Sequence, residues 1–302
     1  MNRKMVWQVD AFADAPYHGN PCAVVFEADD IPTERMQQIA AEMNLSETVF
    51  LLKPERDDAD YRARIFTPQY EMPFAGHPTL SASYAVSQLL ARAGYGPRPK
   101  QLRQECGAGV IPVDILPGED GEDVFSMTQI LPDFRDVDVH KTIFASALGV
   151  PLSAMAQGPI QTVSTGVWWT IVPLVGASSV ANCRPDMTAL GDLAKKMGTV
   201  GVCVFAIGAK AHDCDVKLRV FAPGAGVPED PVTGSANGCL AAYIARHGLL
   251  DHNGNGAISY TAEQGTEMGR EGRAYISVPR GGEGAPVVAG KVVPLMEGSM
   301  VV

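Results

Sequence analysis

The sequence has few of the features that mark membrane-bound or nucleic-acid-binding proteins. Only 19% of its 302 residues are charged, and Asp and Glu outnumber Lys and Arg by 34 to 24, for a formal net charge of −10. This negative charge would repel a phosphate backbone or an anionic membrane, so neither is expected as a partner. The longest apolar run, residues 167–177, is too short to span a bilayer, and only a short apolar stretch precedes Asp10. We therefore expect no signal peptide and a cytoplasmic location.

Signature motifs for metals, nucleotides and serine nucleophiles are also missing. The six cysteines form no CxxC pair and no cluster with histidine, and no HExxH, P-loop, GxSxG or strand-following GxGxxG pattern occurs. We therefore expect no metal and no cofactor, and we interpret the cysteines as structural thiols. A hydrophobic content of 46% over this length is enough for two domains, each with its own core.

An internal repeat organises the chain. Residues 39–51 are similar in sequence to residues 193–205. The segment 61–68, which ends in Arg-Ile-Phe-Thr-Pro, is similar to 216–223. After each comes a glycine turn and a helix of small residues, and further on Glu105 to Gly107 matches Glu263 to Gly265. The repeat predicts an α+β fold with two pseudo-symmetric domains, each a curled sheet around a central helix.

The boundaries follow from the same pattern. We expect an N-terminal half over residues 1–120, completed by about residues 290–302, a C-terminal half over 121–289, and a linking region over 117–138. Apolar spacing predicts helices at 33–43 and 187–197, and alternating or apolar runs predict strands at 7–12, 23–26, 48–52 and 62–66. The segment 78–93, apolar nearly all round and followed by Gly94, predicts a buried central helix.

Two glycine turns are the first candidate site. Gly76 and Gly234 each precede a central helix, whose unpaired N–H groups and positive dipole end attract anions. Two such helix starts, facing each other across a pseudo-twofold axis in a cleft between the halves, would bind a carboxylate. The alternative is that both are ordinary turn glycines.

The two halves differ in their polar residues. Glu47 begins an apolar strand segment where the repeat has Gly201, and His77 follows Gly76 where Ala236 stands near the matching place. The acidic pair Glu229 and Asp230 precedes the second turn. A carboxylate in an apolar cleft has a raised pKa suited to proton transfer. A surface carboxylate for Glu47 and a capping or core role for His77 are the alternatives.

At these residues the sequence resembles the phenazine-biosynthesis isomerase family, called PhzF-like. The resemblance covers nearly the whole chain in order, through the segments DAF (10–12), GNPCAVV (19–25), NLSETVF (44–50), RIFTP (64–68), PFAGHPT (73–79) and EDPVTGSA (229–236). It implies the diaminopimelate-epimerase fold, an active site between two similar domains, and a homodimer.

The resemblance also implies roles for individual residues. In the phenazine enzyme, which acts on trans-2,3-dihydro-3-hydroxyanthranilate, the glutamate of a Ser-Glu-Thr motif moves the proton, and that role maps onto Glu47. A histidine and an aspartate of the family's site map onto His77 and Asp230. The residues that the resemblance implies for substrate binding are Asn20, Ser46, Gly76, Gly234 and Ser235.

One departure from the related epimerases and racemases affects the mechanism. Those enzymes use two cysteines at the glycine turns, where this sequence has Ala75 and Thr233, with no other cysteine beside either turn. The departure favours an isomerase with one carboxylate that takes a proton from one carbon and returns it to another. Two alternatives stay open: a two-base epimerase with Asp230 or His77 as the second base, and a small-molecule binding protein without turnover.

Overall fold

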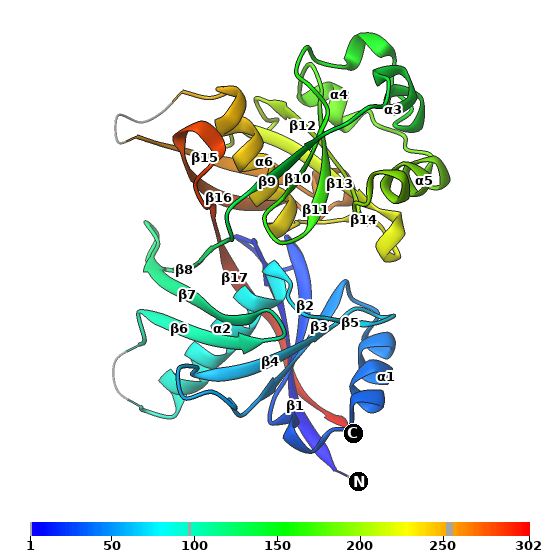
Figure 1. Ribbon diagram of the computed structural model, residues 1–302. Helices are drawn as coiled ribbons and strands as arrows, with labels where there is room; N and C mark the ends of the chain where they lie inside the picture. The colour runs from blue at the N-terminus through cyan, green and yellow to red at the C-terminus, as the bar shows by residue number, and fades with distance from the viewer. Residues whose placement is uncertain (1, 96–97, 252–255) are drawn as a thin grey trace. The chain divides into compact units, whose positions relative to one another are not determined.

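The computed structural model describes residues 2–95, 98–251 and 256–302 (Figure 1). The chain forms two compact units: unit 1 comprises Met1–Met127 and Ala289–Val302, and unit 2 comprises Thr128–Val288. The predicted division after residue 120 falls between two strands of unit 1, β7 (Gly109–Pro117) and β8 (Asp123–Thr128). Across the described ranges, no helix is both long enough and apolar enough to cross a membrane.

Unit 1 is a strongly curled sheet with one helix at its centre. Its remaining elements are β1 (Arg3–Ala11), β2 (Asn20–Val25), η1 (Ala28–Asp30), α1 (Thr33–Met43), β3 (Glu47–Leu52), β4 (Tyr61–Phe66), β5 (Glu71–Met72), α2 (Gly76–Arg92), β6 (Gln101–Cys106) and β17 (Val287–Val301). β1 pairs antiparallel with β2 and β17, β2 pairs parallel with β3, and β4 pairs antiparallel with β3 and parallel with β6. α2 contacts β1, β2, β3, β4, β6 and β7, so the sheet surrounds it (Figure 1).

Unit 2 repeats this arrangement. Its elements are β9 (Asp133–Asp136), α3 (Lys141–Ala147), η2 (Leu152–Ala154), β10 (Gln161–Ser164), β11 (Trp168–Pro173), α4 (Ala177–Ala181), α5 (Met187–Met197), β12 (Gly201–Ile207), β13 (Val216–Ala222), η3 (Pro223–Ala225), β14 (Val227–Asp230), α6 (Gly234–His247), β15 (Ala257–Gln264), η4 (Thr266–Met268), β16 (Gly272–Pro279) and η5 (Arg280–Gly282). β11 and β12 are parallel, as are β13 and β15, which matches β2–β3 and β4–β6 of unit 1. α6 is the central helix and packs on β10, β11 and β16.

The predicted elements agree closely with the observed ones. The helices predicted at 33–43 and 187–197 are α1 and α5, and the four predicted strands fall within or overlap β1 to β4. The central helix starts two residues earlier than predicted, at Gly76. The central helix is buried, as predicted, over most of its length, whereas Leu89 in its last turn is 40% exposed.

The amphipathic pattern of α1 explains how it covers the sheet. Met36, Ile39 and Ala40 recur at helical spacing and pack on Phe50 and Phe66 of the neighbouring strands. Burying a side chain of this size contributes ~1.5 to 3 kcal/mol. In unit 2 the same cover is formed by α5 on β12 and β13, through the buried residues Leu190, Leu193, Val202, Val204 and Phe221.

Two glutamates at equivalent places show that the repeat extends to side-chain contacts. Oε2 of Glu105 accepts hydrogen bonds from the backbone N–H groups of Glu55 (2.7 Å) and Arg56 (3.2 Å). Oε2 of Glu263 accepts one from the backbone N–H of Ala211 (2.8 Å). In both units a buried carboxylate therefore holds a loop against the sheet, and these two glutamates have structural roles.

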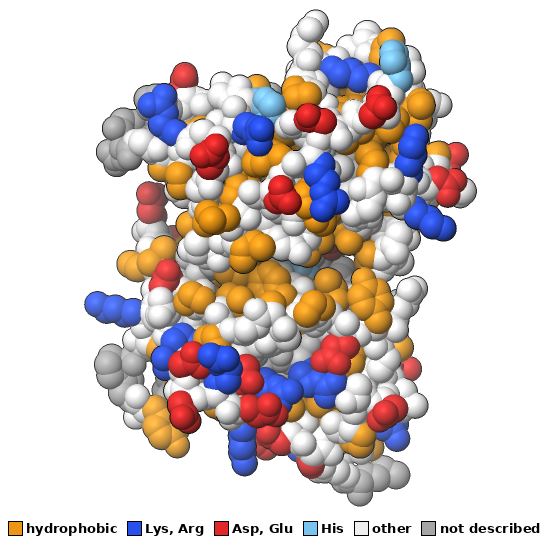
Figure 2. Space-filling view, in the orientation of Figure 1, with side chains coloured by type: hydrophobic (Ala, Val, Ile, Leu, Met, Phe, Trp, Pro, Cys, Tyr) orange, Lys and Arg blue, Asp and Glu red, His pale blue; other side chains and the backbone are white. Residues whose placement is uncertain are grey.

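The charged side chains of the surface are mixed in sign. Figure 2 shows Lys and Arg beside Asp and Glu on the visible face of each unit. In unit 1, Arg64 forms a two-pronged pair with Glu71, and Arg103 forms one with Asp60. Pairs at this level of exposure contribute little to stability, about 0 to 1 kcal/mol each.

Candidate functional site

Glu47 is the first residue of β3 and stands where unit 2 has a glycine. In the parallel pair β2–β3 it lies opposite Cys22, and its side chain is 15% exposed. Gly201 is the first residue of β12 and lies opposite Trp169 in the matching pair β11–β12. The structure thus places Glu47 and Gly201 at equivalent positions, as the sequence repeat predicts.

Unit 2 has no room for an acid at this position. A Cβ atom added to Gly201 would overlap the backbone carbonyl oxygen of Phe221, on the adjacent strand β13, far inside van der Waals contact. Backbone atoms of a paired strand cannot move aside cheaply. The restriction of the carboxylate to unit 1 is therefore built into the backbone of unit 2.

His77 brings an imidazole to this carboxylate. It is the second residue of α2, only 4% exposed, and its Nε2 lies 3.3 Å from Oε2 of Glu47. Burial lowers the pKa of His77 to about 3, although a hydrogen bond with the backbone of Pro21 acts in the opposite direction. The imidazole is therefore neutral at physiological pH, and the contact joins a carboxyl group to an uncharged ring.

The start of α2 has the character of an anion site. Its N-cap residue is Ala75, which has no side-chain oxygen to bond the first-turn N–H groups. The hydroxyl of Thr79 instead donates to the carbonyl of Ala75 (2.8 Å), which fixes the turn without using those donors. The backbone N–H groups of Gly76 and His77 are thus available to a negatively charged group, with the helix dipole behind them.

The start of α6 is the equivalent turn in unit 2. Gly234 is its first residue and Ser235 its second, so Ser235, rather than the predicted Ala236, is the counterpart of His77. The indole Nε1 of Trp169 donates to Oγ of Ser235 (3.0 Å), and Nε2 of Gln129 donates to the carbonyl of Gly234 (3.0 Å). Because Ser235 accepts the indole proton, its own hydroxyl proton can be donated to a ligand.

The acidic pair before this turn divides into two roles. Glu229 forms a two-pronged ion pair with Arg219 (2.8 and 2.9 Å), just as Glu71 does with Arg64 in unit 1, so it belongs to the scaffold. Asp230, the last residue of β14, accepts a 2.5 Å hydrogen bond at Oδ2 from the hydroxyl of Thr233. Asp230 is therefore the carboxylate of the pair that remains a site candidate.

The predicted site residues fall into two groups. Asn20, the fully buried first residue of β2, lies in unit 1, where the other members are Ser46, Glu47, Gly76 and His77. Asp230, Gly234 and Ser235 lie in unit 2. The structure brings Glu47 and His77 together, whereas a shared cleft for Glu47, His77 and Asp230 stays a prediction.

Sequence reasoning missed two residues around these groups, Cys22 and Gln264, and it did not predict the contact of Trp169 with Ser235. Cys22 lies beside Glu47, although no cysteine is near either turn in sequence. Trp169 binds Ser235, and the buried amide of Gln264 contacts Asp230 and Thr233. The signal for Gln264 was available, because the repeat aligns it with Cys106, a difference between the halves of the same kind as Glu47 and Gly201.

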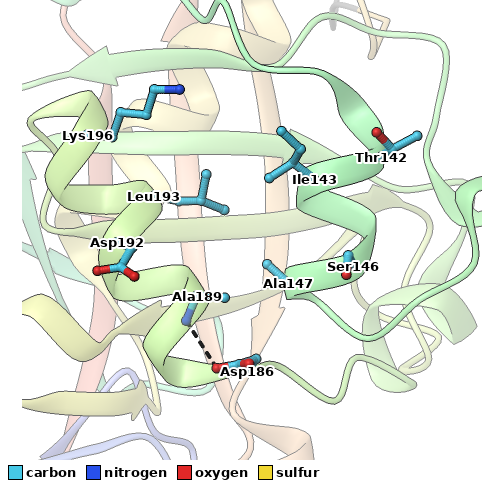
Figure 3. A pocket seen from close by; sticks show the side chains of 9 residues that line it. All are labelled: Thr142, Ile143, Ser146, Ala147, Asp186, Ala189, Asp192, Leu193 and Lys196. Atoms are coloured by element: carbon cyan, nitrogen blue, oxygen red, sulfur yellow. Dashed lines mark hydrogen bonds between the residues drawn. The ribbon is translucent and has the colours of Figure 1, made fainter.

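One cavity of unit 2 is lined by other residues. It measures about 500 Å³ and is lined by side chains of α3 and α5, among them Ile143, Leu193 and Lys196 (Figure 3). Asp186, which also lines it, caps α5 by accepting from the backbone N–H of Ala189 (3.0 Å), the dashed contact in Figure 3. None of the predicted site residues lines this cavity. Within the described ranges, no three His, Cys, Asp or Glu side chains cluster as metal ligands.

Comparisons with known proteins extend over the whole chain. A sequence profile of the family described as "Phenazine biosynthesis-like protein" matches residues 9–298. The trans-2,3-dihydro-3-hydroxyanthranilate isomerase of Pseudomonas aeruginosa is 38% identical over 301 residues, which covers 99% of each chain. A crystal structure of a PhzF-family phenazine biosynthesis protein from Bacillus anthracis superposes with a TM-score of 0.89 at 30% identity, covering 100% of both chains.

A more distant structure supports the fold alone. A hydroxyproline epimerase from Agrobacterium vitis has a TM-score of 0.63 at 13% identity, over 99% of this chain and 92% of the epimerase. The predicted α+β fold of diaminopimelate-epimerase type is therefore confirmed. The family match over nearly the full length and the 38% identity establish relationship as well as fold. The chain belongs to the PhzF-like isomerase family.

Proposed function

We propose that this protein is an isomerase that moves a proton on a small, carboxylate-bearing substrate, with Glu47 as its single acid and base. The observation that carries the proposal is the 3.3 Å approach of the Glu47 carboxyl group to the buried, neutral imidazole of His77 at the start of α2. A neutral ring does not hold the carboxyl group permanently ionised, as a cation would, so Glu47 can alternate between its two protonation states.

The residues at the helix starts support a mechanism with one base. Ala75 and Thr233 are the N-cap residues of α2 and α6, the positions that the two thiols of the related epimerases would occupy. Alanine cannot take a proton, and the Thr233 hydroxyl already donates to Asp230. A carboxylate on one face of the substrate can take a proton from one carbon and return it to another without a second base.

For the substrate we propose a small cyclic or amino or hydroxy acid whose carboxylate binds at the helix starts. The Pseudomonas aeruginosa relative is named for trans-2,3-dihydro-3-hydroxyanthranilate, which carries such a carboxylate. Backbone N–H groups of Gly76 and Gly234 and the hydroxyl of Ser235 supply the donors that a carboxylate needs. We also propose that the protein works as a homodimer with Glu47, His77 and Asp230 in one cleft, without a cofactor.

The test is proton exchange in deuterated water with trans-2,3-dihydro-3-hydroxyanthranilate and a panel of cyclic and amino acids. Wild-type protein is expected to isomerise one of them with deuterium entering at the carbon that receives the proton. Glu47→Gln should bind the same compound without turning it over, whereas Glu42→Gln, at an exposed position of α1, should behave as wild type. Tight binding by wild type and Glu47→Gln alike, with no turnover by either, would instead identify a binding protein.

A two-base epimerase is the second candidate, because Asp230 is a carboxylate that accepts a hydrogen bond and could therefore also accept a proton. Its product differs: the substrate would regain its proton at the same carbon from the opposite face, with inversion of the stereocentre. Deuterium at an inverted centre, lost in both Glu47→Gln and Asp230→Asn, would favour the epimerase. Deuterium at a different carbon favours the one-base isomerase.

A further inference from the structure

Gln264 forms a complete set of hydrogen bonds beside Asp230. It is the last residue of β15 and is 1% exposed. Its Oε1 accepts from the backbone N–H of Thr233 (3.0 Å) and from Nδ2 of Asn237 (3.2 Å). Its Nε2 donates to the backbone carbonyl of Asp230 (2.9 Å) and to Oγ1 of Thr233 (3.1 Å). Both donors and both acceptors of the amide are therefore used.

The orientation of this amide is fixed by neighbouring groups that can only donate or only accept a hydrogen bond. A backbone carbonyl can only accept, so Nδ2 of Asn237, which lies 3.0 Å from the carbonyl of Thr233, must be the donor there. The same nitrogen faces Oε1 of Gln264, which also receives the Thr233 N–H. Nε2 of Gln264 in turn faces the carbonyl of Asp230. A flipped amide would place its nitrogen against two donors, the Thr233 N–H and Nδ2 of Asn237, and its oxygen against the carbonyl acceptor of Asp230.

This orientation determines the direction of the Thr233 hydroxyl. Oγ1 of Thr233 accepts from Nε2 of Gln264, so its single proton points to Oδ2 of Asp230, 2.5 Å away. That oxygen is an acceptor in this arrangement. A hydrogen bond from a neutral donor to a carboxylate oxygen favours the ionised over the protonated form.

The arrangement is absent from the other half of the same fold. At the positions of Asp230, Thr233 and Gln264, unit 1 has Met72, Ala75 and Cys106, which are the equivalent residues of β5, the α2 N-cap and β6. Since unit 1 builds the same strands and the same central helix without these groups, the fold does not require the three hydrogen-bonded side chains.

We propose that Gln264 is a positioning residue that acts through Thr233 to keep the Asp230 carboxylate ionised and in one orientation. The step from this state to substrate rests on the proposed function, whereas the protonation of Asp230 can be measured without any substrate. An ionised Asp230 presents acceptors alone, so the substrate group that it meets is a donor, such as an amine, ammonium or hydroxyl group.

The first experiment follows the ionisation of Asp230 by NMR of protein with labelled aspartate carboxyl groups, with the signal assigned from Asp230→Asn. Thr233→Val and Gln264→Glu are expected to raise the titration midpoint of Asp230 by about one pH unit, which is tenfold in the ionisation constant. In Gln264→Glu, which is nearly isosteric, the new carboxylate takes the Thr233 proton instead of directing it to Asp230. Thr233→Ser keeps the hydroxyl and should keep the midpoint.

The matched control is Gln104→Met in unit 1. Gln104 is a fully buried amide that donates to Oγ1 of Thr79 (2.8 Å) at the start of α2, so its loss disturbs a helix start equally but leaves Asp230 alone. The double variant, Thr233→Val with Gln264→Glu, loses the same hydrogen bond to Asp230 as Thr233→Val does. Its titration midpoint should therefore exceed that of Thr233→Val only by the effect of the added charge. An unchanged midpoint in folded Thr233→Val and Gln264→Glu would overturn the proposal.

The second experiment links the network to turnover. Where a substrate is found, the acid limb of the plot of kcat/KM against pH should move to higher pH in Gln264→Glu and Thr233→Val, in parallel with the NMR midpoint. In Thr233→Ser the acid limb should keep its wild-type position. A residue with a merely structural role would lower activity evenly across the profile. If the NMR midpoint moves while no tested compound turns over, the proposed function fails and the positioning role stands. If the midpoint moves while the acid limb of the profile stays in place, Asp230 does not meet the substrate.

Discussion

Cys22 lies directly opposite Glu47 in the parallel pairing of β2 with β3, so the site's carboxylate has a thiol as its neighbour. Complete burial raises the pKa of Cys22 above its ordinary value, and the negative charge of Glu47 raises it further. A cysteine acts as a nucleophile or as a base only in its thiolate form, and a raised pKa lowers the population of that form. Cys22 is therefore placed to act as a small packing residue beside the carboxylate, and not as a second base.

The first prediction follows from this placement. Cys22 in folded protein should resist iodoacetamide at mildly alkaline pH, and Cys22→Ala should leave the chemical step largely intact. Peptide mass spectrometry after labelling, compared with labelling of the unfolded chain, measures the first expectation. Rapid modification of Cys22 in the folded protein, with matching loss of activity, would point back to thiol chemistry.

A second prediction concerns the length of the Glu47 side chain. Glu47→Gln keeps the shape but cannot accept a proton, so turnover should fall about 10² to 10⁴-fold with binding retained. Glu47→Asp keeps the carboxylate one methylene farther from the substrate and should retain part of the activity. Steady-state kinetics of both, beside Glu42→Gln as the exposed control, provide the comparison. Full activity in Glu47→Gln would exclude Glu47 as the base.

A third prediction is the effect of pH on stability through His77. Its pKa in the folded protein is about 3, below the ordinary value near 6.5, so the unfolded chain binds a proton that the folded chain does not. The stability contributed by the neutral ring is complete above about pH 6.5 and is lost as the pH falls toward about 3, by up to about 1.4 kcal/mol per pH unit.

His77→Asn removes this titration, so its free energy of unfolding should fall less steeply than that of wild type between about pH 6 and pH 4. Urea unfolding at several pH values measures both slopes. The variant starts from a lower stability because it loses the packing of the ring, so the slopes and not the absolute values carry the test. Equal slopes would mean that His77 is protonated in the folded protein.

A fourth prediction uses two adjacent tryptophans. Trp169→Phe loses the indole N–H that bonds Oγ of Ser235, so the serine hydroxyl is no longer directed toward a ligand. Binding of a stable carboxylate such as 3-hydroxyanthranilate should weaken about fivefold, as expected for one hydrogen bond of ~1 kcal/mol. Trp168→Phe is the control, because the ring of Trp168 stacks on the guanidinium of Arg135 instead, with 3.6 Å between Cζ of Arg135 and the ring centroid. Calorimetry on both variants gives the ratio, and equal weakening would count against a role for the indole N–H.

A fifth prediction concerns Gly201. Gly201→Ala forces a Cβ atom against the Phe221 carbonyl and should destabilise the protein by about 1 to 3 kcal/mol or more. Gly298→Ala, in strand β17, where an added Cβ meets nothing within 4 Å, is the matched control and should be nearly neutral. Chemical denaturation of the two variants decides. Unchanged stability in Gly201→Ala would mean that β12 and β13 can separate, and that unit 2 could have carried an acid at this position.

The sequence by itself determined the duplicated fold and the candidates Glu47 and His77. Periodicity of apolar residues is a local property, so it located α1, α5 and the first strands closely, and the repeat then carried the same pattern into unit 2. Comparing the halves also singled out Glu47, because a carboxylate replaces a glycine at a strand start. That information lies within short segments and needs no knowledge of which segments meet.

Only the tertiary structure decided the surroundings of these residues. Cys22 reaches Glu47 through the register of two strands, and Trp169 reaches Ser235 across 66 positions of the chain. The exposure of Leu89 in the last turn of the buried central helix is likewise visible only in the structure. The hydrogen-bond direction at Gln264 depends on partners from β14 and from the start of α6. Such contacts are set by how strands pair and helices pack, and no local pattern in the sequence encodes them.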